Sequence, residues 1–385
     1  MAFLYLAASQ KENIENPYEF PMSGIRVYSL EEALYFCFKH WRQSMDFLNE
    51  QFIHWIESVL GLGQIAAKLR DICRIESFSM RFLAFLSVTD YLPKEELAGL
   101  QKELILWEKR QVWEQLKEQG DYWSLRGASE RALGFYSKAL AEHENLGLLN
   151  NCGVALMQMG NYDNAAALFL RALRLEPKNK QMHFNLIEAY IFAEDYESAQ
   201  SLLEETYAKY PDHPELFYLQ GEIYFNKKNY FEAIKLYEKA IKLNYDEEYI
   251  YKLCDCFIKI RLYDKALSTI QNVANKDITF LRKQAEYYVI AGNVPMAIKS
   301  IEKALTSHSH EAELWIILAQ YHRLDYDNAK AGGAITRALA LSPENPAALL
   351  ERARVEKVQG RIKDYQSVLN RILARFKKDY REYNL

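Results

Sequence analysis

The sequence is poor in cysteine, proline and glycine, and it contains no long apolar run. Its five cysteines, at positions 37, 73, 152, 254 and 256, are odd in number and have no recurring spacing. This argues against a disulfide framework, and we expect a reducing compartment, with the cytoplasm as the default. No stretch approaches the roughly 20 apolar residues of a membrane span. The opening MAFLYLAASQ has no basic residue before its short apolar run, so we expect no secretory signal.

The charge balance and the motif content exclude several classes of function. A net charge of −4 argues against nonspecific binding of nucleic acid. There is no Walker A sequence and no H-E-x-x-H. The segment Gly61-Leu62-Gly63-Gln64-Ile65-Ala66 matches a G-x-G-x-x-A pattern, but it follows an expected helix, whereas a dinucleotide site follows a strand. We therefore expect a protein that is not an enzyme and that uses no cofactor.

Three small clusters of metal-ligand residue types have simpler explanations. Cys254 and Cys256 are too closely spaced to face one way on a helix, so core packing suffices. His308 and His310 lie in an expected loop, where a solvated pair is the simpler interpretation. Asp325, Asp327 and Asn328 lack the glycine and the terminal glutamate of a calcium loop, and a turn role suffices. We expect no metal site.

A repeated pattern dominates the rest of the chain. Alanine returns every 31 to 34 residues, and Tyr365 takes the eighth slot. Each of these positions is followed after four residues by a large apolar residue and preceded at twelve by a mostly small one. The alanines are Ala132, Ala165, Ala199, Ala233, Ala266, Ala297 and Ala331. A fixed period near 34 residues predicts a solenoid of two-helix repeats.

The residue types in this pattern suit the packing of helix pairs. Two antiparallel helices approach closely only where side chains are small, and large residues fill the grooves beside the crossing. One such pair cannot bury its apolar face alone, so neighbouring pairs must stack. The clearest copy, residues 146–179, carries Gly153, Ala165, Phe169, Ala172 and Pro177. With these residues the chain resembles the tetratricopeptide repeat family, which implies an all-α, right-handed superhelical solenoid of helix-turn-helix repeats.

We expect three parts: an N-terminal helical module over 1–112, the repeats over 113–379, and a tail over 380–385. The module should begin with an irregular arm over 1–28. The capping box from Ser29 to Glu32 should then open a helix with about 30 residues of helical apolar spacing. Further helices are expected near 64–75 and 77–89, and from Pro93 towards 112. The expected repeats are 113–145, 146–179, 180–213, 214–246, 247–277, 278–311, 312–345 and 346–379.

A candidate binding face follows from the resemblance, which implies that the first helix of each repeat lines a concave groove. Positions 5, 9 and 12 of each repeat share one stripe of that helix. In repeats three to six this stripe holds aromatic and acidic residues, namely Phe184, Glu188, Tyr218, Glu222, Phe225, Tyr251, Asp255 and Glu286. Such a surface suits a segment with apolar and basic side chains. The plainer interpretation, that surface helices are often acidic and tyrosine is abundant here, stays open.

The predicted function is that of a non-catalytic scaffold or adaptor that binds a protein or peptide in this groove. One alternative is a regulator whose repeats bind a small signalling peptide and whose N-terminal module transmits the response. A second is an enzyme with an active site within 1–112, where His40 and His54 lie among many carboxylates without a spaced set.

The last repeat raises a separate question, because its second helix has no following repeat to pack against. Its apolar stripe is Tyr365, Val368, Leu369, Ile372 and Phe376. A solenoid end normally needs a polar cap for solubility. We expect residues 379–385 to fold back over the stripe, with weak homodimerisation through this end as the alternative.

Overall fold

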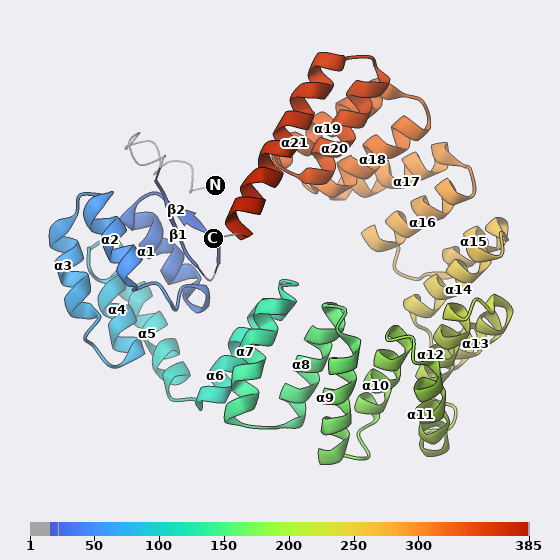
Figure 1. Cartoon of the computed structure of the whole chain (residues 1–385), viewed down its shortest axis with the longest axis horizontal. Helices are drawn as coiled ribbons and strands as arrows, with labels where there is room; N and C mark the ends of the chain where they lie inside the picture. The colour runs from blue at the N-terminus through green and yellow to red at the C-terminus, as the bar shows by residue number, and fades with distance from the viewer. Residues whose placement is uncertain (1–15, 22, 384–385) are drawn as a thin grey trace. The chain divides into compact units, whose positions relative to one another are not determined.

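The chain forms an all-α repeat solenoid with one small sheet near its N-terminus (Figure 1). The computed structural model describes residues 16–21 and 23–383, with side chains described as far as residue 373. Two compact units are present, Met1–Asn179 and Lys180–Leu385. The predicted fold class is confirmed. The segment MAFLYLAASQ, for which we expected no secretory signal, lies outside the described residues. The side chain of Phe376, which we placed in the apolar stripe of the last repeat, is also outside the described part.

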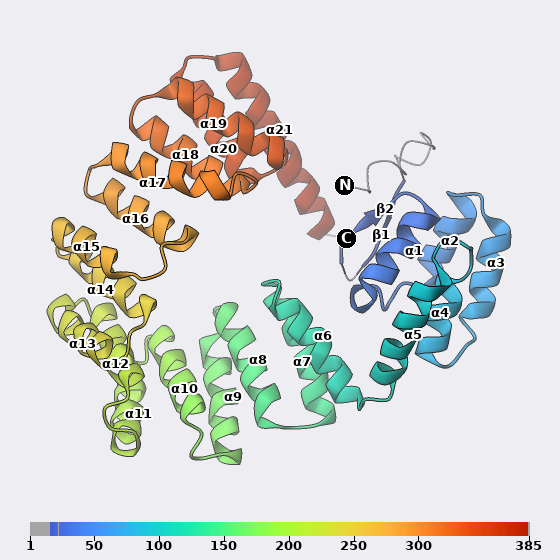
Figure 2. The ribbon, with the colours of Figure 1, turned by 180° about the vertical axis from the view of Figure 1, so that it is seen from behind.

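The N-terminal module is a compact helical cluster with its own core. Its helices are α1 (Leu30–Lys39), η3 (Trp41–Gln43), α2 (Glu50–Ser58), α3 (Gly63–Ile72), α4 (Phe78–Leu86) and α5 (Lys94–Glu108). The antiparallel strands β1 (Tyr18–Glu19) and β2 (Arg26–Val27) lie beside α1 (Figure 2). The core gathers aromatic rings, including Phe20, Phe52 and Phe85, which are fully buried.

The module differs from the sequence prediction in two places. The arm expected to be irregular contains the β1–β2 hairpin. The apolar stripe that follows does not form one long helix, because the chain leaves the helical conformation at His40 and α2 starts only at Glu50. Asn49 starts this second helix by accepting a hydrogen bond from the backbone N–H of Phe52 at 2.8 Å. Periodicity alone carries no sign of such a break, since the apolar spacing continues through it.

Each expected repeat corresponds to one pair of helices. In the first unit the pairs are α6 (Val112–Ser124) with α7 (Ser129–Glu142), and α8 (Leu146–Gln158) with α9 (Tyr162–Leu175). The second unit begins with α10 (Lys180–Phe192), α11 (Tyr196–Lys209), α12 (Pro214–Asn226), α13 (Tyr230–Leu243), α14 (Glu247–Lys259), α15 (Tyr263–Thr269) and η4 (Ile270–Asn272). It continues with α16 (Ile278–Ile290), α17 (Val294–Ser307), α18 (Ala312–Leu324), α19 (Asn328–Leu341), α20 (Pro346–Val358) and α21 (Ile362–Tyr383).

In three helix pairs an aromatic ring of the second helix packs closely against a glycine of the first. A Cβ atom built on Gly221 of α12 would lie 2.6 Å from the ring of Tyr237 on α13. On Gly153 of α8 it would lie 2.4 Å from the ring of Phe169 on α9. Real Cβ atoms do not approach carbon so closely, so the missing side chain is what lets the ring pack against the neighbouring helix. The seven alanines of the repeat pattern are fully buried at the same crossings.

The turn inside every repeat contains one residue in the left-handed region. Glycine fills this position in four repeats, at Gly127, Gly160, Gly292 and Gly360. The other four use residues with a side chain, Glu194, Lys228, Arg261 and Tyr326, with φ of 61° to 62°. A left-handed residue ends an α-helix by turning the chain sharply. The turn geometry is therefore common to all repeats even where glycine is absent.

The C-terminal helix α21 continues to Tyr383, so residues 380–383 of the expected tail are helical and do not fold back. Ile372 on this helix is half-buried. No helix in the described part of the chain is both long and apolar enough to cross a bilayer.

Candidate functional site

The residues predicted to bind a partner lie on the first helices of repeats three to six, all within the second unit. Each of α10, α12 and α14 carries an aromatic residue followed four positions later by a carboxylate. Residues four apart lie on one face of a helix, one turn above the other. The pairs are Phe184 with Glu188, Tyr218 with Glu222, and Tyr251 with Asp255. The repeat register thus gives each helix the same two-residue face.

Two of the three aromatic residues are less accessible than the sequence suggests. Phe184 is 4% exposed and Tyr218 is 7% exposed, so both belong to the core of this unit. The ring of Phe184 packs on His213, with 4.9 Å between ring centroids. Tyr218 stacks on Tyr249 of the next repeat, also at 4.9 Å. Aromatic rings this size bury large areas against neighbouring repeats, so these two residues support the face from beneath.

Glu222 is buried and fully engaged rather than part of an open row of carboxylates. It accepts a short hydrogen bond from the hydroxyl of Tyr237 through Oε1. Its Oε2 pairs with Nζ of Lys252 on α14 at 2.6 Å. A buried carboxylate is tolerated only when its charge is paired and its oxygens are hydrogen-bonded. Glu222 therefore joins α12, α13 and α14, and its first role is structural.

Asp255 makes a similar but more open contact. It is half-buried and accepts a hydrogen bond from the hydroxyl of Tyr287 on α16 at 2.7 Å. The same hydroxyl lies 3.2 Å from the backbone oxygen of Tyr251. The Tyr251 hydroxyl is buried and has no hydrogen-bond partner among the described residues. Burial raises the pKa of Tyr251 to about 12, so its hydroxyl stays protonated.

Glu188 differs from these carboxylates because it has no partner among the described residues. It is half-buried, and no described residue gives it a hydrogen bond or an ion pair. Loss of hydration raises the pKa of Glu188 to about 7, and repulsion from Glu215, Glu248 and Glu222 adds to the rise. Lys252 acts in the opposite direction. A nearby positive charge from outside the chain would favour the ionised form of Glu188.

Four residues around Glu188 were not predicted from the sequence: Glu215, Glu248, Tyr249 and Lys252. The Tyr218 hydroxyl donates to Glu248 at 2.9 Å, and the Tyr249 hydroxyl donates to Glu215 at 2.8 Å. These two bonds cross between α12 and α14. Glu215 and Glu248 each occupy the second position of their repeat, and that recurrence is the signal that could have revealed them.

Phe225 and Glu286 complete the predicted set and are accessible. Phe225 is half-buried and meets Tyr230 edge-on, with 5.5 Å between ring centroids. Glu286 is exposed and lies 3.5 Å from Lys283, one turn away on α16. An exposed pair of this kind contributes little to stability. The face therefore offers apolar contacts at Phe225 and Tyr251 and negative charge at Glu188, Asp255 and Glu286.

The structure shows the surroundings of the cysteine, histidine and aspartate clusters for which the sequence predicted no metal site. Cys254 and Cys256 are buried, and burial raises the pKa of both thiols to about 12. The rings of His308 and His310 lie 6.4 Å apart. Asp327 caps α19 by accepting a hydrogen bond from the Lys330 backbone at 3.0 Å. Within the described residues, no three ligand side chains of these types are arranged to hold a metal ion.

Comparison with known proteins identifies the repeats. Models of the tetratricopeptide repeat family match residues 156–223, 214–247 and 282–346. The chain therefore carries tetratricopeptide repeats within residues 156–247 and 282–346, and the predicted family is confirmed.

Several relatives match part of the chain. Human tetratricopeptide repeat protein 16 is 23% identical over 250 residues, which is 57% of this chain and 28% of that protein. A TPR repeat-containing protein of Methanocaldococcus jannaschii is 28% identical over 159 residues, 40% of this chain and 28% of the relative. The human protein O-mannosyl-transferase TMTC3 is 26% identical over 257 residues, 62% of this chain and 25% of that protein. The chain thus spans about a quarter of the length of these relatives.

Solved structures of repeat proteins also resemble the chain. A tetratricopeptide repeat protein from Parabacteroides merdae aligns over 64% of this chain and 99% of its own, with 19% identity and a TM-score of 0.44. A thermophilic TPR protein of Thermus thermophilus aligns over 46% of this chain and 98% of its own, with 19% identity and a TM-score of 0.40.

Proposed function

We propose that this tetratricopeptide repeat protein is a non-catalytic scaffold or adaptor, and that the face formed by α10, α12, α14 and α16 binds a segment of a partner protein. The segment carries apolar side chains together with at least one lysine or arginine. The observation that carries the proposal is Glu188, a half-buried carboxylate without a partner among the described residues.

The charge around Glu188 supports a basic partner residue. Glu215, Glu222 and Glu248 all repel a negative charge at Glu188, and Lys252 acts in the opposite direction. Because Lys252 is already paired with Glu222, the local balance stays negative. A lysine or arginine from a partner relieves this repulsion and favours ionised Glu188.

Apolar contact supports the rest of the segment. Phe225 and Tyr251 are half-buried, so each leaves part of its ring open to apolar side chains of the segment. A few aromatic anchors usually carry most of the binding free energy at such a surface. Phe184 and Tyr218 hold these contacts in place from within the core, so their truncation should reduce stability as well as binding.

Selection of peptides from a random display library on the full-length chain tests this proposal. Enriched peptides should combine lysine or arginine with aromatic or aliphatic residues. Binding of these peptides should weaken about tenfold or more in Glu188→Lys, because the variant places like charges together. Glu302→Lys, on an exposed position of α17, is the matched control and should bind normally. A basic peptide pool that binds Glu188→Lys as well as the wild type would refute the site.

The same experiment addresses the peptide-sensing alternative. A scaffold should bind the peptides as parts of a longer partner, with affinity that rises when flanking residues are added. A sensor of a small signalling peptide should instead bind a short free peptide with full affinity and lose affinity when its ends are extended.

Weak homodimerisation through repeat eight stays a prediction of its own. Sedimentation of the wild type and of Ile372→Glu over a range of concentrations tests it. A concentration-dependent dimer that disappears in Ile372→Glu is the expected result if α21 is covered by a second copy, whereas a wild-type monomer at every concentration would contradict it.

A further inference from the structure

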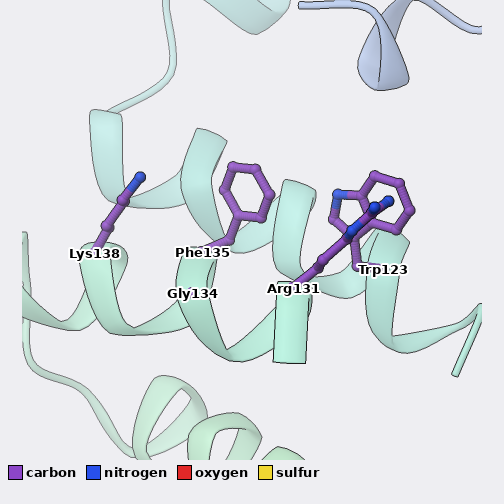
Figure 3. Close-up of a pocket in the computed structure, with 5 residues that line it drawn as sticks. All are labelled: Trp123, Arg131, Gly134, Phe135 and Lys138. Carbon is purple, nitrogen blue, oxygen red and sulfur yellow. The ribbon is translucent and has the colours of Figure 1, made fainter. Parts of the chain in front are cut away.

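A second surface combines an apolar recess with positive charge, and it lies in the first repeat, within the first unit. Trp123 of α6 and Phe135 of α7 line a recess of about 230 Å³, together with Arg131, Gly134 and Lys138 (Figure 3). Arg131, Phe135 and Lys138 project from the same side of α7, because residues three and four apart share one helix face. We refer to these five residues as the Phe135 surface.

Gly134 leaves the space between the side chains of this surface open. It lies in the interior of α7, and a Cβ atom built there would meet nothing within 4 Å. Glycine in a helix interior costs about 0.5–1 kcal/mol relative to alanine, and here no packing contact of the described residues requires it. A larger residue at this position would fill the recess from below.

A buried polar atom at the recess is unpaired. Trp123 is 6% exposed, and its indole Nε1–H finds no hydrogen-bond acceptor among the described residues. Figure 3 shows this nitrogen on the side of the ring that faces Phe135. An unpaired buried donor costs free energy, so it favours a ligand that brings an acceptor, such as a peptide carbonyl oxygen.

A second cavity of about 310 Å³ shares Phe135 with the first. Its walls include Trp107 of α5 and Gln119 of α6, which are 8% and 6% exposed. The Nε1–H of Trp107 and the Oε1 of Gln119 are both buried without a partner among the described residues. Around Phe135 there are thus two unpaired indole donors and one amide acceptor. An extended peptide presents carbonyl oxygens and N–H groups along its length, so it can pair with both the indole donors and the amide acceptor.

The charge of the Phe135 surface determines the kind of peptide. Lys138 forms no ion pair with a described residue, and its Nζ lies 5.9 Å from the centre of the Phe135 ring. The guanidinium of Arg131 lies 4.8 Å from the Trp123 ring. No carboxylate is among the described residues that line this recess, whereas Asp46 lines the second cavity. We propose that the Phe135 surface binds an acidic segment of a partner protein, whose large apolar side chain lies over Gly134 between Trp123 and Phe135 and whose carboxylate pairs with Lys138.

This partner chemistry is the opposite of that proposed for the face around Glu188, so the two sites can be tested separately. Peptides selected from a random display library on the full-length chain should include a second pool, in which a large apolar residue lies next to aspartate or glutamate. Fluorescence anisotropy should show that Gly134→Leu weakens this pool about tenfold or more, because the new side chain occupies the recess. Lys138→Glu should weaken it about threefold or more and reduce its dependence on salt.

Gly333→Leu provides the matched control. Gly333 also lies inside a second helix of a repeat, α19, and a Cβ atom there also meets nothing within 4 Å. It should keep full affinity for the acidic pool, and circular dichroism should show both glycine variants folded. Trp123→Phe, which keeps a ring but removes the indole donor, should weaken binding about threefold or more.

Three results would overturn the proposal: acidic peptides that bind Gly134→Leu as well as the wild type, a selection without an acidic and apolar pool, or a wild-type dimer that Gly134→Leu abolishes. The last would mean that a second copy of the chain covers the surface. Loss of the basic pool alone would contradict the face around Glu188 and leave the Phe135 surface supported.

Discussion

Replacement of Glu188 by glutamine should stabilise the protein at pH 8 and leave its stability almost unchanged at pH 4.5. The pKa of Glu188 rises from 4.5 to about 7 on folding, first through loss of hydration and then through repulsion from neighbouring glutamates. At about 1.4 kcal/mol for each tenfold change in proton affinity, this amounts to about 3 kcal/mol. The ionised carboxylate is therefore the destabilising form, and glutamine keeps its shape without its charge.

The sign of the pH dependence follows from proton uptake. Between pH 4.5 and 7 the folded protein keeps the Glu188 proton and the unfolded chain has lost it, so the contribution of Glu188 to stability falls as pH rises through this window. Urea unfolding of wild type and Glu188→Gln, compared at pH 4.5, 6 and 8, measures the difference. It should grow from near zero to about 3 kcal/mol. Glu302→Gln, on the exposed side of α17, should show no such trend. A gain for Glu188→Gln that is equal at all three pH values, or absent at pH 8, would refute the reasoning.

Three further predictions concern stability and can be checked by thermal or urea unfolding. Gly221→Ala should destabilise the folded protein by about 1–3 kcal/mol, because its Cβ would clash with an aromatic ring 2.6 Å away. The control Gly333→Ala should instead stabilise it by about 0.5–1 kcal/mol. Equal effects of the two substitutions would contradict the packing described. Lys252→Met should cost about 3 kcal/mol, because it leaves buried Glu222 without its cation, and a neutral result would mean that Glu222 is solvated. Tyr326→Gly should stabilise by about 1 kcal/mol, because φ is 62° there and the side chain is 90% exposed; a loss would mean that the ring makes contacts that matter.

The arrangement of the repeats was predictable because it depends on contacts between residues of fixed spacing. The small residue at Gly221 and the ring at Tyr237 are sixteen positions apart in the sequence, and the structure brings them together within a single helix pair. Each repeat packs two helices at an equivalent crossing, so the spacing of small and large residues recurs even where other positions vary. The turns at Lys228 and Arg261 lack the glycine that would indicate a left-handed residue in the sequence. Only the positive φ of these residues in the structure reveals the turn geometry.

The candidate site was predictable only in part. Helical spacing placed Tyr218 and Glu222 on one face, and they do share that face. It could not show that Tyr218 stacks on Tyr249 or that Glu222 pairs with Lys252, because both contacts join different repeats. Contacts of this kind depend on how far one helix pair is displaced from the next, and one sequence does not encode that displacement in its spacing.

The most direct test of partner binding is a calorimetric titration of the full-length chain with a selected basic peptide at pH 8 and pH 6. We expect tighter binding at pH 8, because Glu188 is mostly ionised above its pKa of about 7 and mostly protonated below it. Glu188→Gln should bind weakly and equally at both pH values. Equal wild-type affinity at the two pH values, or full affinity in Glu188→Gln, would contradict the proposal that this carboxylate receives a basic residue of the partner.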